Sequence, residues 1–192
     1  MAKRTFDSRV TESEPNKGKV IDVEVDTHVT GSIEFANGAL ATLVTSFDVW
    51  DSEPPRMEIY GTKGTICIRD IDPVDGPNLF GGEVLVRDVD NYRWKGLPRR
   101  TPFPDWREVL IEHRFNNLSH RKNSRGIGLV DMAYALMAKR EARASGTMAL
   151  HCLEIMEGLL ISASERRFYH LHSLCERPTP LPVNFPDDER AC

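Results

Sequence analysis

The chain has 192 residues, of which 40% are hydrophobic and 28% are charged, and its formal net charge at pH 7 is −4. This length suits a single domain with its own core, and the acidic balance does not favour nucleic acid or an anionic membrane as a partner. The sequence shows no signal-peptide pattern, no CxxC pair and no apolar run near the roughly 20 residues that cross a bilayer, so we expect a cytoplasmic protein with reduced thiols.

The first elements that the sequence predicts are a polar lead-in and a hairpin. Residues 1–22 are rich in charge, and we expect them to be irregular. Apolar and polar residues then alternate over residues 29–35, which predicts a strand. Asn37-Gly38 suits a type I′ turn, because both residue types tolerate positive φ. Residues 40–49 are therefore expected to form the returning strand.

A second hairpin and a further strand follow. Residues 57–60 and 65–68 are short β-prone runs on either side of a Gly-Thr-Lys-Gly turn at 61–64. The aspartate-, proline- and glycine-rich residues 70–82 predict a loop. Residues 83–87 predict one more strand, so this part of the chain is expected to be an antiparallel sheet.

The helices come late in the chain. Residues 126–140 carry apolar side chains at helical spacing, and Ser145 is suited to the N-cap of a second helix. Residues 168–174 predict a last strand, and residues 176–192 form a proline-rich acidic tail. We expect Cys152 to be a small core residue, because it lies on an apolar stripe of the second helix. That stripe consists of Ala149, Cys152, Leu153, Met156, Leu159, Leu160 and Ala163.

The order of these elements predicts the fold class. Strands that come first and helices that follow favour an α+β fold, whereas a doubly wound sheet needs strands and helices in alternation. We therefore expect a mostly antiparallel open β-sheet with helices packed on one face, formed by residues 23–175.

Recognisable catalytic motifs are absent from the sequence. It contains no GxGxxG, no GxxxxGK[ST] and no GxSxG. His170 and His172 would share one face of the last predicted strand and could bind a metal, but a third ligand is not evident, so a solvated face is the simpler interpretation. Asp131 falls in the first turn of a predicted helix, where free N–H groups favour a capping role over catalysis. We therefore predict no metal site and no self-sufficient active site.

Five motifs nevertheless occur in a suggestive order. They are THVTGSIEF at 27–35 with NGA and TSFDVW after it, EIYGTKGT at 58–65, NSRGIG with DMA at 123–133, RASG at 143–146, and CERP at 175–178. Together they resemble the C-terminal domain of the Gfo/Idh/MocA family of NAD(P)-dependent oxidoreductases. The resemblance covers roughly residues 5–182.

The resemblance implies a function that this chain would perform only in part. Family members pair a Rossmann domain with such a sheet domain and transfer hydride between NAD(P) and a sugar, inositol or related polyol. The Rossmann half supplies the glycine fingerprint and a catalytic lysine, and neither motif is in this sequence. We therefore expect a truncated protein, inactive alone, with no catalytic or cofactor-binding residue and no cofactor of its own. On the resemblance alone, the substrate-binding candidates are His28, Trp50, Arg56, Asn123 and Arg125.

The partners that the resemblance implies leave two hypotheses open. The open sheet face of the family commonly packs against another subunit, so we expect a homo-oligomer through that face and a small sugar-like ligand. A separate Rossmann-domain chain would be a further partner if the enzyme is split. The alternative is a non-catalytic sugar-binding or assembly module that retains the sheet interface.

Overall fold

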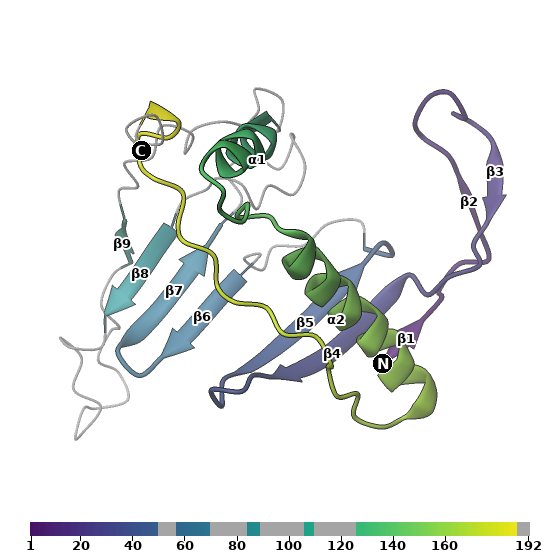
Figure 1. Ribbon diagram of the computed structural model, residues 1–192. Helices are drawn as coiled ribbons and strands as arrows, with labels where there is room; N and C mark the ends of the chain where they lie inside the picture. The colour runs from purple at the N-terminus through teal and green to yellow at the C-terminus, as the bar shows by residue number, and fades with distance from the viewer. Residues whose placement is uncertain (50–56, 70–83, 89–105, 110–125, 188–192) are drawn as a thin grey trace, which may run out of the picture. The chain divides into compact units, whose positions relative to one another are not determined.

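The computed structural model describes residues 1–49, 57–69, 84–88, 106–109 and 126–187 (Figure 1). The chain divides into two compact units. The first unit comprises Met1–Ser52 and Ser145–Arg177, and the second comprises Glu53–Ala144 and Pro178–Cys192.

The centre of the first unit is the hairpin that the alternating pattern predicts. Strand β4 (His28–Glu34) pairs antiparallel with β5 (Leu40–Ser46), and the register places His28 opposite Ser46. The short strand β1 (Ala2–Lys3) pairs with the other edge of β4, so the sheet order is β1-β4-β5. The predicted hairpin is confirmed.

The turn of this hairpin differs from the expected type I′ turn. Of the Asn37-Gly38 pair, only Gly38 has a positive φ, at 84°. The Gly38 N–H donates to the Phe35 carbonyl and the Phe35 N–H donates to the Ala39 carbonyl. This pattern is typical of a longer hairpin loop that ends in a left-handed glycine. The Asn37 side chain accepts the Ala39 N–H at 3.0 Å instead of supplying a second left-handed residue.

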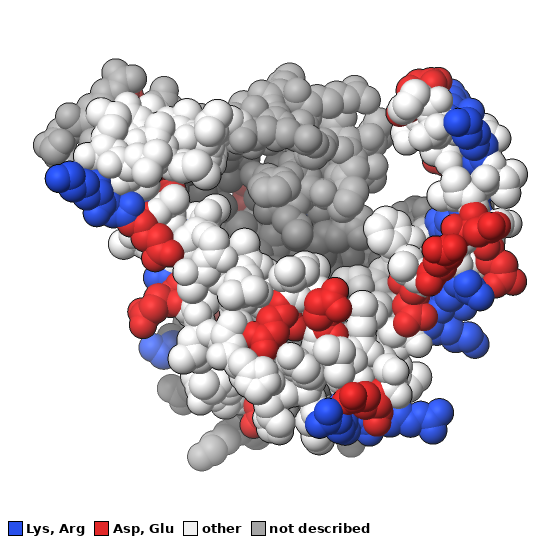
Figure 2. All heavy atoms as spheres, turned by 45° about the vertical axis from the view of Figure 1, so that its right-hand side comes forward, with Lys and Arg blue, Asp and Glu red and all other residues white. Residues whose placement is uncertain are grey.

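The N-terminal residues, expected to be irregular, contain three short strands. Besides β1, a ribbon forms from β2 (Ser8–Val10) and β3 (Val20–Asp22), which pair antiparallel. Strands of two or three residues are too short to show alternation, and β1 is paired with a distant segment, so periodicity could not reveal them. Charges of both signs gather on this ribbon (Figure 2). The domain boundaries after residues 22 and 175 stay a prediction.

Helix α2 (Gly146–Glu165) packs on one face of the first unit's sheet. It begins as predicted, because the Ser145 side chain accepts the Met148 N–H at 3.2 Å. The helix lies close to β4 at Gly31, where an added Cβ would come within 2.5 Å of the Leu159 side chain. The glycine therefore permits the close approach of helix and sheet.

Only part of the predicted apolar stripe faces the sheet: Leu159 approaches Gly31, but other members of the stripe are exposed. Leu153 is 49% exposed and Met156 is 56% exposed, and Cys152 is exposed rather than a core residue. The buried position is Gly158, where an added Cβ would come within 2.6 Å of the Tyr169 ring. The sequence prediction was wrong about this face because polar side chains of α2 find partners within the first unit.

Those partners lie in the segment 167–173, which forms no strand, so the strand predicted over residues 168–174 is wrong. Glu154 accepts the backbone N–H groups of His172 at 2.7 Å and Ser173 at 2.8 Å. His151 Nδ1 lies 2.8 Å from the Ser173 hydroxyl, and the Ser162 hydroxyl donates to the Arg167 carbonyl. In a strand, these backbone groups would form hydrogen bonds to a neighbouring strand. Here they form hydrogen bonds to the side chains of Glu154 and Ser162 on α2.

Among the described residues, α2 also has the length and composition of a membrane-crossing helix, with a mean hydropathy of 1.2. Glu154 stands near its middle and binds the segment 167–173. A membrane interior disfavours an ionised carboxylate of this kind. We therefore interpret α2 as a helix of the first unit.

The second unit contains the other predicted hairpin. Strands β6 (Met57–Gly61), β7 (Gly64–Ile68), β8 (Val84–Asp88) and β9 (Arg107–Glu108) form an antiparallel sheet in that order. Its buried centre is the registered pair Cys67 and Leu85, which are 3% and 6% exposed. The predicted strands are confirmed, whereas the predicted loop at 70–82 lies outside the described residues.

Helix α1 (Ile127–Met137) completes the second unit and confirms the predicted helix. Tyr134 packs edge-on against Phe185, which is 1% exposed. Part of the expected tail is thus held against α1. Both units combine antiparallel strands with a helix, so the α+β class is confirmed.

Candidate functional site

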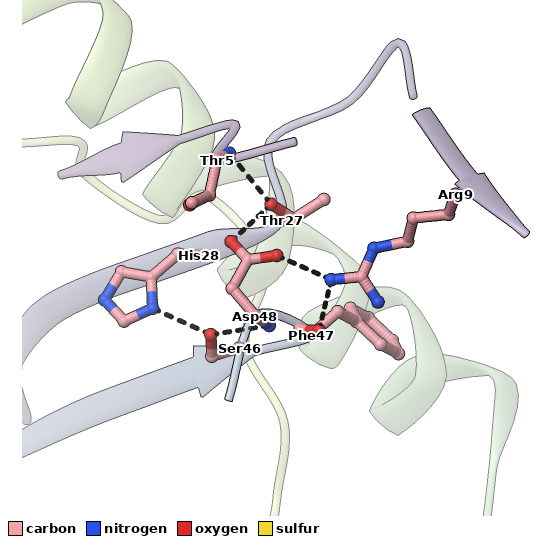
Figure 3. Close-up of polar contacts among 7 residues, drawn as sticks. All are labelled: Thr5, Arg9, Thr27, His28, Ser46, Phe47 and Asp48. Carbon is pink, nitrogen blue, oxygen red and sulfur yellow. Dashed lines mark hydrogen bonds and ion pairs between the residues drawn. The ribbon is translucent and has the colours of Figure 1, made fainter. Parts of the chain in front are cut away.

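The candidate site is a polar group at the open end of the β4–β5 hairpin, which we call the Asp48 cluster (Figure 3). Thr27 immediately precedes β4 and Asp48 lies two residues after β5, so the hairpin register brings the two together. The Phe47 N–H donates to the Thr27 carbonyl at 2.9 Å and extends the pairing past the last registered residues. The cluster consists of Thr5, Arg9, Thr27, His28, Ser46 and Asp48.

The carboxylate of Asp48 is the centre of the cluster. Its Oδ2 accepts the Thr27 hydroxyl at 2.6 Å, and its Oδ1 accepts Arg9 Nη2 at 2.8 Å. The Asp48 side chain is only 7% exposed. Hydrogen bonds from Thr27 and Thr5, together with the charge of Arg9, hold the pKa of Asp48 below its ordinary value. Asp48 is thus an anion fixed in place by three segments of the chain.

The lead-in contributes the cation of this cluster. Arg9 Nη2 also donates to the Phe47 carbonyl, and the Arg9 guanidinium lies 5.3 Å from the centre of the Phe6 ring. The Thr5 N–H reaches the Thr27 hydroxyl at 3.4 Å. Residues expected to be irregular therefore hold the hairpin end in one geometry.

His28 is the one predicted site residue that the described structure places. Its Nδ1 lies 2.8 Å from the Ser46 hydroxyl, and that hydroxyl accepts the Asp48 N–H at 3.1 Å. With Nδ1 engaged, Nε2 has no hydrogen bond among the described residues. A half-buried imidazole with one nitrogen fixed and one open can exchange hydrogen bonds with a ligand hydroxyl.

The cluster does not have the arrangement of a nucleophilic triad. Asp48 accepts from Thr27 and Arg9, and its carboxylate makes no contact with His28 in the described structure. A nucleophilic serine needs a base that a third group orients. The chemistry that the cluster supports is therefore hydrogen bonding and electrostatic orientation of a polar ligand.

The remaining predicted substrate-binding residues, Trp50, Arg56, Asn123 and Arg125, lie outside the described residues. Thr5 and Arg9 were not predicted as site residues because they belong to the lead-in, which was expected to be irregular. A usable signal was present at Asp48, a charged residue between the apolar residues Phe47 and Val49 at the end of a predicted strand.

A second buried carboxylate, Asp131, lies in the second unit and has a structural role. It is beyond the first turn of α1, so the expected capping role is wrong. Its carboxylate instead binds Arg140 Nη2 at 2.8 Å, the Arg143 N–H at 2.8 Å, and the Arg143 guanidinium. Burial opposes ionisation of Asp131, but the bonds from Arg140 and Arg143 outweigh it and lower its pKa. Asp131 therefore fixes the turn that follows α1.

The described residues contain no group of three or more His, Cys, Asp or Glu side chains placed to hold a metal ion. His170 and His172 lie in the segment 167–173, which forms no strand. The His172 N–H is bonded to Glu154, and its ring packs edge-on against Tyr169.

The described residues also do not fit a nicotinamide dinucleotide. Such a cofactor is bound where a parallel strand leads through a glycine turn into a helix. Every strand pairing in the described structure is antiparallel. Gly126 and Gly128, which open α1, form only a GxG. We therefore assign no reaction step to a cofactor in this chain.

The fold and the cluster define an α+β domain that can orient a polar ligand but has no seat for a redox cofactor among its described residues. Residues 3–67 match the family model of the GFO/IDH/MocA C-terminal domain. The match confirms the resemblance over residues 3–67, which hold the first two motifs, while the three later motifs lie outside the matched residues. The matched residues contain every member of the Asp48 cluster. Neither the curated proteins nor the solved structures gave a match.

Proposed function

We propose that this chain is the substrate-binding and oligomerisation domain of a Gfo/Idh/MocA-type oxidoreductase, which acts on a sugar, inositol or related polyol. The observation that carries the proposal is the family match over residues 3–67, which includes the whole Asp48 cluster. Proteins of this family are generally NAD(P)-dependent. The parent activity would therefore need a dinucleotide-binding domain in addition to the residues described here.

His28 is the residue that we propose to touch the substrate. A polyol presents hydroxyl groups that both donate and accept, and His28 Nε2 can serve in either role once Nδ1 is bonded to Ser46. Asp48 and Arg9 fix the end of the strand from which His28 projects. Trp50, Arg56, Asn123 and Arg125 complete the proposed substrate side, by stacking on the sugar or by hydrogen bonding to it.

The open face of the first unit's sheet is the proposed oligomer interface. Helix α2 packs on the face that contains Gly31, and β-strand alternation places His28 on the opposite face. On β5, Leu40 and Val44 share that opposite face and are 76% and 62% exposed. Exposed apolar side chains on a sheet face favour association.

The isolated chain would not transfer hydride. The reaction requires the donor and acceptor carbons to be held near contact distance, and that requires a cofactor seat. A separate Rossmann-domain chain is the partner that would provide it. We propose that the protein acts in the cytoplasm, without nucleic acid and without a membrane.

Calorimetric titration with myo-inositol and with glucose tests the substrate role. We expect binding by the full chain, and a loss of at least about tenfold in affinity for His28→Ala. His170→Ala, an exposed histidine of the segment 167–173, is the matched control and should leave the affinity unchanged. If the two variants bound the polyols with equal affinity, His28 would not contact the substrate.

The second candidate is a non-catalytic assembly module, which the exposed apolar residues of β5 also favour. It predicts no binding of either polyol, together with a stable oligomer in light scattering that Leu40→Glu dissociates. The assembly-module hypothesis would be excluded if the wild-type chain bound a polyol and were a monodisperse monomer in light scattering.

A further inference from the structure

Ser46 is placed to decide which ring nitrogen of His28 carries the proton. The two residues stand opposite each other in the β4–β5 register, and His28 Nδ1 lies 2.8 Å from the Ser46 hydroxyl (Figure 3). Such a contact can run in two directions, because a hydroxyl can donate to a bare Nδ1 or accept from a protonated one. In the first case Nε2 carries the proton and is a donor, and in the second Nε2 is an acceptor. The direction of this one hydrogen bond therefore decides what His28 can offer a ligand.

The backbone of Asp48 favours donation by Ser46. The Asp48 N–H donates to the Ser46 hydroxyl oxygen at 3.1 Å, so one lone pair of that oxygen is already engaged. If Ser46 then donates to His28 Nδ1, the three groups form a chain in which each donates to the next. The members of such a chain polarise and strengthen one another.

The opposite direction would leave a group unsatisfied. Two N–H groups, from Asp48 and His28, would converge on the single hydroxyl oxygen of Ser46. The hydroxyl proton of Ser46 would then have no acceptor among the residues that the structure describes. The Nε2–H tautomer of His28 therefore satisfies more hydrogen-bonding groups than the Nδ1–H tautomer does.

A second histidine–serine pair in the first unit has the opposite arrangement. His151 Nδ1 lies 2.8 Å from the Ser173 hydroxyl, the same distance as in the pair of His28 and Ser46. The Ser173 hydroxyl also bonds to the ionised carboxylate of Glu154, which can only accept. The Ser173 proton is therefore engaged by Glu154, so His151 must donate from Nδ1. The chain thus contains its own reference for the other tautomer.

We propose that Ser46 is a positioning residue, which fixes His28 in the Nε2–H tautomer and so makes it a hydrogen-bond donor toward a ligand. This narrows the two roles that an imidazole offers to one. The ligand atom that faces Nε2 is then an accepting oxygen: a carbonyl, a ring oxygen or a hydroxyl used through its lone pair. A protonated amino group would meet a second donor there and is disfavoured. The tautomer follows from Asp48, Ser46 and His28 alone, whereas the ligand class rests on the proposed function.

Nitrogen NMR of the isotope-labelled full chain tests the tautomer without any ligand. In a neutral imidazole, the nitrogen that lacks the proton resonates far downfield of the nitrogen that carries it. At about pH 8.5, where imidazole side chains are ordinarily neutral, we expect the Nε2–H pattern for His28 and the Nδ1–H pattern for His151. The variants His28→Ala and His151→Ala assign the two sets of signals. An Nδ1–H pattern for His28 would overturn the proposal.

Substitutions at the two serines separate positioning from a merely structural role. Ser46→Ala removes the donor to Nδ1, so we expect a mixture of His28 tautomers, and Ser46→Thr should restore the Nε2–H form. Ser173→Ala is the matched control, since it removes the equivalent hydroxyl beside His151 and should leave His28 unchanged. A pure Nε2–H pattern in Ser46→Ala would show that Ser46 does not set the tautomer. If Ser46→Ala does not fold, the wild-type spectrum still decides.

Titration with myo-inositol tests the ligand side separately. Because only the Nε2–H fraction would bind, the dissociation constant of Ser46→Ala should rise in inverse proportion to the fraction that NMR measures. Ser46→Thr should return it to the wild-type value. An unchanged dissociation constant despite mixed tautomers would overturn the donor role of His28. Absence of binding by a chain with the expected tautomer would overturn the ligand class and the proposed function, while the role of Ser46 in fixing the tautomer would stand.

Discussion

At the scale of single residues, Asp48 joins three parts of the first unit. It binds Thr27 before β4 and Arg9 from the β2–β3 ribbon, while its own backbone continues β5. Its lowered pKa means that ionised Asp48 stabilises the folded chain. This contribution is fully present at pH values above the ordinary pKa of the carboxyl group, 3.8. It is lost as the pH falls through the lower pKa that Asp48 has in the folded chain.

Replacing Asp48 with Asn should therefore destabilise the first unit. The substitution keeps the shape of the side chain but removes the charge that Arg9 pairs with. We expect a clear decrease in the free energy of unfolding at pH 7, measured by urea denaturation, and a smaller decrease at pH 3. Asp7→Asn is the control, because Asp7 is 93% exposed and pairs with Arg4 at the surface. Equal effects of the two substitutions would contradict the assigned role of Asp48.

The same reasoning at Asp131 gives a numerical expectation in the second unit. Its side chain is 6% exposed and accepts from two arginines. Asp131→Asn should lower the free energy of unfolding by roughly 1–3 kcal/mol, because buried donors lose a charged acceptor. Thermal unfolding followed by circular dichroism measures this change. A neutral result would mean that Arg140 and Arg143 are satisfied without Asp131.

At the scale of elements, the packing of α2 on the sheet depends on the absence of a side chain at Gly31. Gly31→Val should destabilise the chain by roughly 1–3 kcal/mol, because its side chain would overlap Leu159. Adding Leu159→Ala should recover part of the loss, since it removes the atoms that clash. A double-mutant cycle in urea measures the coupling. Additive effects of the two substitutions would show that β4 and α2 are not in contact there.

Glu154 attaches the segment 167–173 to α2. Hydrogen bonds from Ser173 and from the backbone of His172 lower the pKa of Glu154 to about 2. Because the folded value is below the ordinary value of 4.5, the attachment is intact above that pH and weakens as the pH falls toward 2.

Glu154→Gln should loosen this segment at neutral pH. We expect faster amide hydrogen exchange at His172 and Ser173, by at least about tenfold, with little change in the β4–β5 hairpin. Glu157→Gln, on an exposed face of the same helix, is the control. Unchanged exchange at His172 would show that Glu154 does not hold the segment.

These elements show what sequence patterns could and could not reveal. The β4–β5 hairpin, the β6–β7 hairpin and the Ser145 cap were predictable, because local alternation, turn residues and a capping residue indicate them. Strand β1, by contrast, is two residues long and pairs Lys3 with His28, 25 positions further along the chain, so no local pattern indicates it. The buried face of α2 was missed because Gly158 and Glu154 look unfavourable for burial until Tyr169 and Ser173 are placed beside them.

The candidate site was predictable to a smaller extent for a related reason. His28 and the hairpin around it could be selected from the sequence, since both lie in a recognisable motif. Arg9 could not, because its pairing with Asp48 joins positions 39 residues apart through a turn in the lead-in. Polar clusters built from several segments have no periodic signature, whereas strands and helices do.

At the scale of the whole molecule, we propose that the open sheet face associates with another copy and that the Asp48 cluster orients a ligand. The match to the GFO/IDH/MocA C-terminal domain runs from the last residue of β1 to the fourth residue of β7 and so includes residues of both units. The central claim is that these residues hold a substrate but not the hydride carrier.

Titration of the full chain with NADH and NADPH, followed by nicotinamide fluorescence in the presence of saturating myo-inositol, tests this claim most directly. A chain that has only the substrate side should leave the emission of both cofactors unchanged at micromolar concentrations. Enhanced, saturable fluorescence with a micromolar or tighter dissociation constant would contradict the account. Such a result would require a dinucleotide-binding site, and we assign none to this chain.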